Sequence, residues 1–249
     1  MTVHLLGTGS ADGGPDRTTT MLTVEHGPTT VLVDCGGDAG QRMLSAGLAP
    51  EDLTAVVLTH EHPDHLAGFP LLVEKMWLRG RTAPIDVYGL APTLAKARAL
   101  FAVFSTDGWE GLPEIRYHDV EAAPGAHVVD LGGVEITATP VDHPVPTIGL
   151  CFAADGMRVA YSCDTAPTDA VADLARGADL LIHEATGSTP GVHSSPKEAA
   201  QVAADAGAGR LVLVHAPPDA SDDGLAAARA VFAETSWGWD GAQIEVGGA

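Results

Sequence analysis

Cysteines are few in this sequence, and they do not form a disulfide framework. The chain contains three, Cys35, Cys151 and Cys163, an odd number without the regular spacing of a disulfide-rich secreted domain. This usage favours a reducing compartment. The first residues, MTVHLLGTGS, lack the basic stretch and the long apolar run of a signal peptide, and no segment approaches the roughly 20 apolar residues of a membrane span. We therefore expect a cytoplasmic protein without a membrane partner.

Positively charged residues are also scarce. The chain has 13 Lys and Arg against 33 Asp and Glu, which gives a formal net charge of −20. A molecule with this charge repels polyanions, so nucleic acid is only weakly supported as a partner. The exception is a basic strip made of Lys75, Arg79, Arg81, Lys96 and Arg98. The strip is either a solvated helix face or a docking site for an anionic substrate.

Linkers, repeats and low-complexity tracts are absent as well, which predicts a single domain over residues 1–249. Short apolar runs bounded by Gly, Pro and Thr alternate with segments of helical periodicity. We predict strands at 3–7, 21–25, 30–34, 55–59, 85–89, 134–141, 147–154, 158–164, 178–185 and 210–216. Helices are expected near 38–46, 64–78, 91–104, 195–207 and 222–233. The alternation predicts an α/β (α+β) fold.

The segment AVVLTHEHPDHLAGF, residues 55–69, places four metal-competent side chains behind a buried strand. They are His60, His62, Asp64 and His65. Crowding these polar groups at the end of a buried segment is costly unless a cation collects them. Any one of these histidines taken alone is more simply an ordinary core or loop residue. The H-x-H-x-D-H arrangement as a whole instead favours a metal site.

Three further strands end in residues of the same kind. His143 follows the strand at 134–141, and Asp164 and His215 lie at the ends of two later strands. Strand ends at one sheet edge converge in space, where layered folds place their sites. Five His and two Asp suit two divalent ions in N/O coordination, which zinc accepts, with manganese or iron as alternatives. Four histidines lack such a context: His4, His26, His118 and His127.

The chain resembles the metallo-β-lactamase fold family nearly end to end. THEHPDH resembles that family's metal-binding loop, and His143, Asp164 and His215 follow in the family's order. HLLGTGSA, VDCGGDAGQRML, DLLIHEAT and VHSSPKEAAQVAADAGAGRLVLVH are most similar to ribonuclease Z and its phosphodiesterase relatives. The resemblance implies a four-layer αββα sandwich of two similar halves with a dinuclear metal site. One ion would take His60, His62 and His143. The other would take Asp64, His65 and His215, with Asp164 bridging.

The same resemblance implies a hydrolytic mechanism that uses a metal-bridging hydroxide. Asp64 would both ligate and orient the nucleophile, and Glu184 would orient His193 as the proton donor to the leaving group. His183 is expected to be structural, and Asp34 to brace a ligating histidine. Three glycines are expected to let backbone pass close to the metals: Gly7, Gly9 and Gly36.

Two departures from ribonuclease Z bear on the substrate. His143 and Asp164 are only 21 positions apart, too few for the flexible arm with which ribonuclease Z grips precursor tRNA. Cys163 also stands where the family's motif has glycine, and we expect it to be a small buried filler. We therefore predict a phosphodiesterase acting on a small or flexible substrate, with a homodimer as a further expectation from relatives. The alternatives are a tRNA 3′-end endonuclease, an aryl sulfatase or other ester or lactone hydrolase, and a non-catalytic binding protein with a vestigial site.

Overall fold

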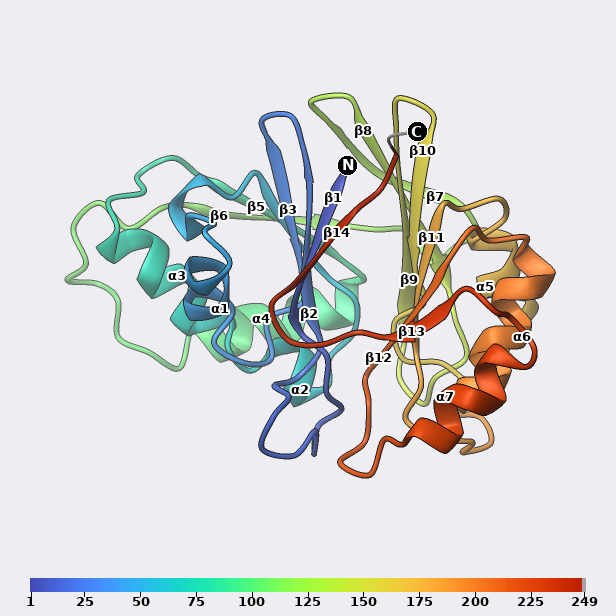
Figure 1. Cartoon of the computed structure of the whole chain (residues 1–249). Helices are drawn as coiled ribbons and strands as arrows, with labels where there is room; N and C mark the ends of the chain where they lie inside the picture. The colour runs from blue at the N-terminus through green and yellow to red at the C-terminus, as the bar shows by residue number, and fades with distance from the viewer. Residues whose placement is uncertain (248–249) are drawn as a thin grey trace.

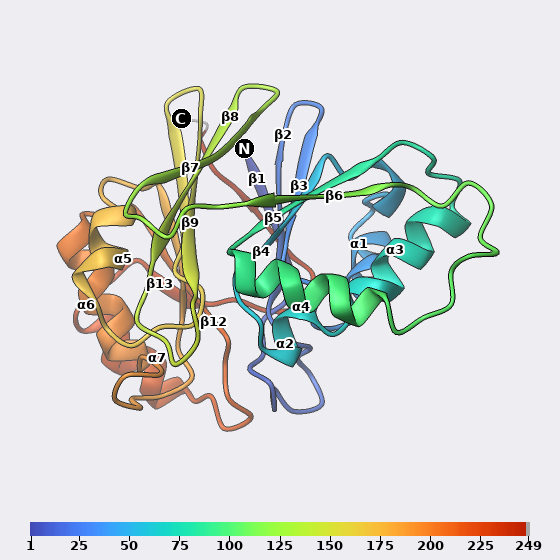
Figure 2. The ribbon, with the colours of Figure 1, turned by 180° about the vertical axis from the view of Figure 1, so that it is seen from behind.

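Two seven-stranded sheets packed face to face form the centre of the computed structural model, which describes residues 1–247 (Figure 1). Helices cover the outer face of each sheet, so the layers run helix, sheet, sheet, helix, as Figure 2 shows from behind. The predicted αββα sandwich is confirmed. No helix within residues 1–247 has the length and apolar character needed to cross a membrane.

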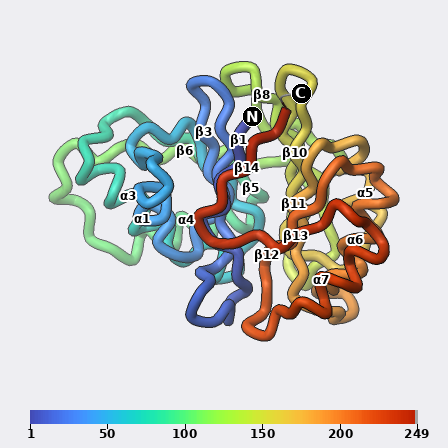
Figure 3. Tube along the Cα trace, viewed as in Figure 1, coloured from blue at the N-terminus to red at the C-terminus, as the bar shows by residue number. Residues whose placement is uncertain are grey.

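The first sheet has the strand order β14-β1-β2-β3-β4-β5-β6. Its strands are β1 (Thr2–Gly7), β2 (Met21–His26), β3 (Thr29–Val33), β4 (Ala55–Leu58), β5 (Ile85–Gly89), β6 (Ile115–Asp119) and β14 (Ala242–Glu245). The helices of this half are α1 (Ala39–Ser45), the 3-10 turn η1 (Pro50–Asp52), α2 (Pro63–Leu66), α3 (Phe69–Leu78) and α4 (Ala91–Phe101). Figure 3 shows the end of the chain returning to place β14 beside β1.

The second sheet has the order β13-β12-β11-β10-β9-β8-β7. Its strands are β7 (Ala126–Leu131), β8 (Val134–Pro140), β9 (Ile148–Ala154), β10 (Met157–Tyr161), β11 (Leu180–Glu184), β12 (Leu211–Val214) and β13 (Thr235–Trp237). The helices of this half are α5 (Asp169–Leu174), α6 (Pro196–Ala206) and α7 (Asp222–Arg229). Helix α6 begins at a capping box formed by Ser195 and Glu198, and it ends at Gly207 with φ +64°.

Strand direction brings the ends of several strands to one edge. Strands β3 to β6 are parallel to one another, and so are β10 to β13. Strand β8 is antiparallel to β9, which is antiparallel to β10, so β8 points the same way as β10. The carboxyl ends of β3, β4, β8, β10, β11 and β12 therefore meet at the edge where α2 lies, the lower edge in Figure 1.

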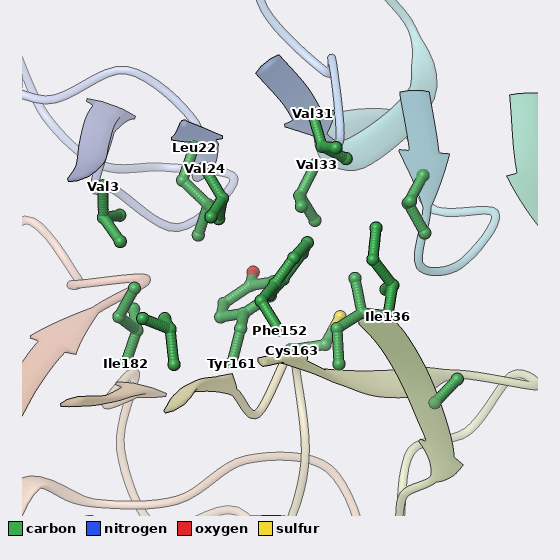
Figure 4. Packing of buried hydrophobic residues seen from close by; sticks show 14 of the residues in the cluster. Val3, Leu22, Val24, Val31, Val33, Ile136, Phe152, Tyr161, Cys163 and Ile182 are labelled. Carbon is green, nitrogen blue, oxygen red and sulfur yellow. The ribbon is translucent and has the colours of Figure 1, made fainter. Parts of the chain in front are cut away.

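The largest apolar cluster lies between the sheets. Val3, Leu22 and Val33 from the first sheet face Phe152 and Tyr161 from the second, as Figure 4 shows. Two further clusters lie under the helices, one beneath α1, α3 and α4 and one beneath α5 to α7. Burial of this apolar surface holds the two sheets in fixed register, so the strand ends that form the site are held by a rigid scaffold.

The helix predicted at 64–78 is in fact two helices, α2 and α3. Gly68 separates α2 from α3, and its N–H donates to the carbonyl of Cys35 at 2.8 Å. A Cβ at position 68 would lie 2.0 Å from the carbonyl oxygen of Gly37. The chain therefore bends at Gly68, where only glycine allows the two backbones to approach so closely.

Candidate metal centre

The His-rich loop follows β4 and forms the first turn of α2. His62 is the N-cap of that helix and Pro63 its first residue, a position that suits proline because the N–H there has no helical partner. The loop is fixed from behind by the segment after β3: the N–H of Cys35 donates to the carbonyl of His65 at 2.8 Å. A Cβ at Gly36 would lie 1.7 Å from the Asp64 carbonyl oxygen. Close backbone packing therefore sets the position of the loop.

The structure brings the seven candidate ligands together at this edge of the two sheets. Nε2 of His143 lies 3.2 Å from Nδ1 of His62. Nε2 of His215 lies 3.3 Å from carboxylate oxygens of both Asp64 and Asp164. Among the described residues, five sets of donor atoms lie within 4.8 Å of one another, and two of these sets, called the donor groups below, contain all seven candidates: His60, His62 and His143 in one, and Asp64, His65, Asp164 and His215 in the other. The other three sets add Cys163 beside His60 and His65, and His193 beside His143 and Asp164 or beside Glu184 and His215. The donor groups match the two ligand sets expected from the sequence, with Asp164 in the second group.

Three residues at this edge adopt left-handed backbone conformations. Asp34, Cys163 and His215 follow β3, β10 and β12, with φ of 60°, 54° and 52°. Such a conformation is strained for residues other than glycine and recurs at functional sites. These conformations also explain why the observed strands end earlier than the predictions at 30–34, 158–164 and 210–216. A positive φ at these positions interrupts the extended backbone just after each strand.

Hydrogen bonds behind the rings determine which nitrogen of each imidazole is available. Nδ1–H of His65 donates to Oδ2 of Asp34 at 2.8 Å, as expected for Asp34. Nδ1–H of His143 donates to the carbonyl of Val192 at 3.1 Å. Nδ1 of His215 lies 2.6 Å from the Thr186 hydroxyl, which itself donates to the His215 carbonyl and so must accept from the ring. In each case Nε2 keeps its lone pair for a cation.

The fit of these residues to divalent ions is tested by the polar atoms left without partners. Nε2 of His60, Nε2 of His65 and Oδ1 of Asp164 are buried and have no hydrogen-bond partner. Buried polar atoms are costly when unpaired, so their convergence at one point indicates a cation site. Imidazole nitrogens and carboxylate oxygens are also the donors that zinc accepts. The residues therefore fit the metal that the fold implies.

The charge states of the cluster agree with this interpretation. Burial, aided by the nearby His65, His143 and His62, lowers the pKa of His60, which keeps its ring neutral and able to ligate. Burial opposes a charge on Asp164, but the imidazoles of His215 and His65 outweigh it and hold the pKa of this carboxyl well below its usual range. A neutral imidazole and an ionised carboxylate are the forms that bind cations.

His193 and Glu184 form a pair beside the cluster. Nδ1 of His193 lies 2.9 Å from Oε1 of Glu184, and the ring of His193 lies 5.5 Å from those of both His143 and His215. Glu184 is buried and also accepts from the N–H groups of Ser194 and Thr186. Burial alone would lower the pKa of His193, but the hydrogen bond and charge of Glu184 together raise it. The contact with Glu184 therefore favours the protonated form of the imidazole.

Other sequence-based expectations have mixed outcomes. His183 is buried, with Nδ1 2.8 Å from the Glu184 carbonyl, and belongs to neither donor group. Gly36 packs against the backbone of Asp64, as expected. Gly7 and Gly9 pack mainly against the loop at 13–19, and Gly9 also pairs with Ala216, the residue after His215. Thr186 and the Val192 carbonyl were not predicted. A threonine or a backbone carbonyl carries no distinctive sequence signal for this role.

The basic strip at 75–98 is largely occupied by internal contacts. Lys75 Nζ pairs with Asp38 at 2.8 Å, and Arg79 pairs with Glu51. Arg81 donates to backbone carbonyls, and the Arg98 guanidinium lies 4.0 Å from the centre of a tyrosine ring. These contacts engage most of the positive charges of the strip within the protein, which argues against a docking site for an anion.

Comparison with known proteins places the chain among metal-dependent hydrolases. Residues 29–216 match the sequence model of the β-lactamase superfamily domain. The chain is 35% identical to ribonuclease Z of Mycobacterium bovis (strain BCG / Pasteur 1173P2) over 243 residues, covering 87% of this chain and 86% of that protein. It is 30% identical to ribonuclease Z of Methanothermobacter thermautotrophicus over 305 residues, covering 99% and 97%.

Solved structures share the fold. The metallo-β-lactamase fold protein YhfI from Bacillus subtilis superposes with a TM-score of 0.84 at 24% identity, covering 99% of each chain. The short form of human tRNase Z superposes with a TM-score of 0.82 at 23% identity, covering 98% of this chain and 99% of that chain. A diphosphatase of the PhnP family gives 0.79 at 21%, covering 98% and 97%.

Proposed function

The chain belongs to the β-lactamase superfamily, in its ribonuclease Z-like branch, and is a metal-dependent hydrolase; from this premise we propose that it is a phosphodiesterase acting on a small or flexible phosphodiester. The observation that carries the proposal is the pairing of two cation-ready donor groups with an imidazole that is held by a buried carboxylate beside them. A phosphodiester needs charge neutralisation on its oxygens and a proton for its leaving group. The site offers groups for both tasks.

We assign one ion to His60, His62 and His143, and the other to Asp64, His65 and His215, with Asp164 between them. Zinc is the proposed metal, with manganese or iron as alternatives. When bound, a pair of divalent ions lowers the pKa of a water and neutralises charge on the phosphate. Asp64 is the least buried of the carboxylates in the cluster, so it is the one placed to orient the attacking water.

His193 acts as the general acid in this proposal. Its Nδ1 is held by Glu184, so Nε2 is the nitrogen that carries the transferable proton. The carboxylate of Glu184 stabilises the imidazolium before transfer and orients the ring throughout. Glu184 is itself fixed by backbone N–H donors, so the pair keeps its geometry while the proton moves.

The size of the substrate follows from the connection between β8 and β10. The 21 positions from His143 to Asp164 are taken up by one loop, β9, a turn and β10. No segment is left there to form an arm that grips a folded RNA. The net charge of −20 and the internal pairing of the basic strip also oppose tight binding of a polyanion.

Ribonuclease activity is the second candidate, because the similarity to ribonuclease Z of Mycobacterium bovis reaches 35% identity over most of both chains. A cut after the discriminator base of precursor tRNA, with binding that weakens steeply as salt rises, would favour this candidate. Hydrolysis of a sulfate ester, carboxylic ester or lactone is the third, since an activated water attacks those bonds as well.

The experiment is a side-by-side assay of the metal-reconstituted protein on an aryl phosphodiester, an aryl sulfate, a lactone and precursor tRNA. We expect turnover of the phosphodiester, with a loss of at least about 1000-fold in Asp64→Ala. Asp130→Ala is the matched control, because that carboxylate is exposed on β7 far from the donor groups. Turnover of another substrate in place of the phosphodiester would contradict the proposal.

We also propose that the protein forms a homodimer through α3 and α4. Exposed apolar side chains on this side include Leu71, Val103 and Phe104, which are 39%, 74% and 53% exposed. Leu71 and Phe104 line one groove of ≈ 250 Å³, and Val103 lines a neighbouring one next to α2. Large apolar residues gathered on one face of a protein mark an interaction site, and a second copy presents the same face.

A further inference from the structure

Cys163 lies between the two sheets and touches the metal centre from behind. Its Sγ is 2.9 Å from Oγ1 of Thr59 and 3.5 Å from Nδ1 of His60, and the side chain is fully buried (Figure 4). Cys163 follows β10 in the second sheet, whereas Thr59 and His60 follow β4 in the first. The contact therefore joins the two halves of the sandwich directly behind one donor group.

The hydrogen bonds of Thr59 can be assigned completely. A hydroxyl has one proton and two lone pairs. The proton goes to Oδ2 of Asp34 at 2.8 Å, since a carboxylate only accepts. Thr59 must then accept from Nδ1–H of His60 at 3.1 Å and from the S–H of Cys163. All three positions on the hydroxyl are used.

The geometry makes the thiol a donor, because its Sγ lies 2.9 Å from Oγ1 of Thr59 while the only proton of that hydroxyl is directed to Asp34. With its proton directed to Asp34 and one lone pair filled by the thiol, the Thr59 hydroxyl keeps a single position for His60, and that position is a lone pair. Nδ1 of His60 stays protonated, and its buried and unpartnered Nε2 keeps the lone pair toward the donor group formed with His62 and His143.

The backbone at Cys163 supports a role for the side chain. Its φ of 54° lies in the left-handed region, where glycine is unstrained and cysteine is not. Asp34 and His215, which share this conformation at the same edge, both use their side chains in the cluster. A side chain retained at a strained position indicates that it does something glycine cannot.

We propose that Cys163 is a positioning residue: through Thr59 it fixes the tautomer and orientation of His60 for metal binding. The proposal rests on the metal centre assigned above and extends it to a residue that makes no contact with substrate. It goes beyond the expectation that Cys163 is a small buried filler, which its burial in the apolar cluster between the sheets agrees with. Its consequence is uneven between the two ions, because His60 faces this contact directly, whereas His65 is connected to it only through Oδ2 of Asp34, which also accepts from Thr59.

The test compares zinc affinities at the two sites, measured by competition with a chromophoric chelator. In Cys163→Ala the affinity of one ion is expected to fall about 10-fold, as for other groups that orient a ligating histidine. The second ion is expected to bind as in the wild type. Cys163→Ser keeps a hydroxyl donor and should restore most of the loss. Cys151→Ala is the matched control, because Cys151 is also buried but lies within β9, away from the donor groups.

Cys163→Gly separates positioning from folding. Glycine suits the backbone at this position, so this variant should fold even if the alanine variant does not, and it should show the same selective loss of zinc affinity. Unchanged zinc affinity in both Cys163→Ala and Cys163→Gly would overturn the proposal. An equal loss of affinity in Cys151→Ala would also overturn it, and so would an equal loss at the two metal sites of the Cys163 variants. If the wild type binds two ions but cleaves no phosphodiester, the proposed function is contradicted. The role of Cys163 is then still tested by the zinc affinities of its variants. A wild-type protein that binds none contradicts both.

Discussion

At the scale of single residues, four of the five candidate histidine ligands have their second nitrogen already engaged. The acceptors are a carboxylate, two hydroxyls and a backbone carbonyl, supplied by Asp34, Thr59, Thr186 and Val192. Each one fixes a tautomer and a ring orientation before any ion arrives. The remaining lone pairs point to shared positions, so little reorganisation accompanies metal binding.

The role of His193 is tested by varying the leaving group. In His193→Ala, turnover of an alkyl phosphodiester is expected to fall about 100-fold, because the departing alkoxide needs a proton. An activated aryl leaving group departs without one, so its turnover should change less than about fivefold. The measurement is kcat/KM for both substrates, with His127→Ala, an exposed histidine on β7, as the control. Equal losses on both substrates would remove His193 as the acid.

At the scale of elements, the His-rich loop holds its shape through backbone contacts with the segment after β3. Gly36 packs against the Asp64 carbonyl. The N–H of Cys35 donates to the carbonyl of His65, and the carbonyl of Cys35 accepts from the N–H of Gly68. These contacts form between two loops that leave neighbouring parallel strands, β3 and β4. The sheet therefore determines where the loop lies, and the loop determines where its four candidate ligands lie.

A single methyl group at Gly36 tests this coupling. Gly36→Ala places Cβ against the Asp64 carbonyl oxygen, so the loop must move and the fold should lose about 1–3 kcal/mol of unfolding free energy. Zinc affinity and phosphodiester turnover should fall together. Gly108→Ala is the control, because a Cβ there meets nothing within 4 Å. The readouts are urea denaturation and chelator competition, and wild-type behaviour of Gly36→Ala in both would contradict the coupling.

Much of the architecture could be predicted from the sequence because its strongest signals are local. The buried strand β4 followed by His60, His62 and His65 is a dense pattern, and α6 carries its cap in Ser195 and its stop in Gly207. Strand ends were less predictable, since a positive φ at His215 depends on the tertiary site rather than on local preference. The apolar run in the sequence therefore predicted a strand to residue 216, although β12 ends at Val214.

The elements missed from the sequence are weak in pattern or defined by their partners. Strands β6 and β7 are half-exposed, with polar residues on much of their length. Strands β13 and β14 have three and four residues and exist because β12 and β1 offer edges to pair with. Helix α5 has six residues. Such segments are determined by long-range pairing, which a single sequence does not display.

At the scale of the whole molecule, the donor groups join the two halves. His60, His62 and Asp64 come from the first sheet, whereas His143 and His215 come from the second. An ion held by both halves opposes their separation, and a ligand that binds only the folded state stabilises it by mass action. The core between the sheets and the metal centre at their edge therefore act together.

Metal removal should lower the stability of the intact fold. With free zinc at 100 times its dissociation constant, one site contributes about 2.7 kcal/mol, which corresponds to a fall of at least about 5 °C in Tm when a chelator is added. The Cys163→Ala variant should lose less on chelation than the wild type, since its zinc binds more weakly. Thermal scans with and without chelator check this, and identical Tm values would show that the ions do not join the halves.

The homodimer is tested by charging its proposed face. Val103→Glu introduces a charge among the exposed apolar side chains beside α3 and just after α4, and should convert the dimer to a monomer in light scattering, at concentrations where the wild type is dimeric. Trp239→Glu is the control, because Trp239 is 64% exposed and lies outside the two grooves beside α3 and α4. A wild-type monomer, or a dimer that survives Val103→Glu, would contradict the proposed interface.

The most direct test of the account is a crystal structure of the zinc-loaded protein with anomalous scattering at the zinc edge. Two peaks are expected, one contacting His60, His62 and His143 and the other contacting Asp64, His65 and His215, with Asp164 reaching both. A single peak elsewhere, no peak from metal-replete protein, or rings of His143 and His215 turned away from the loop at 60–65 would contradict it.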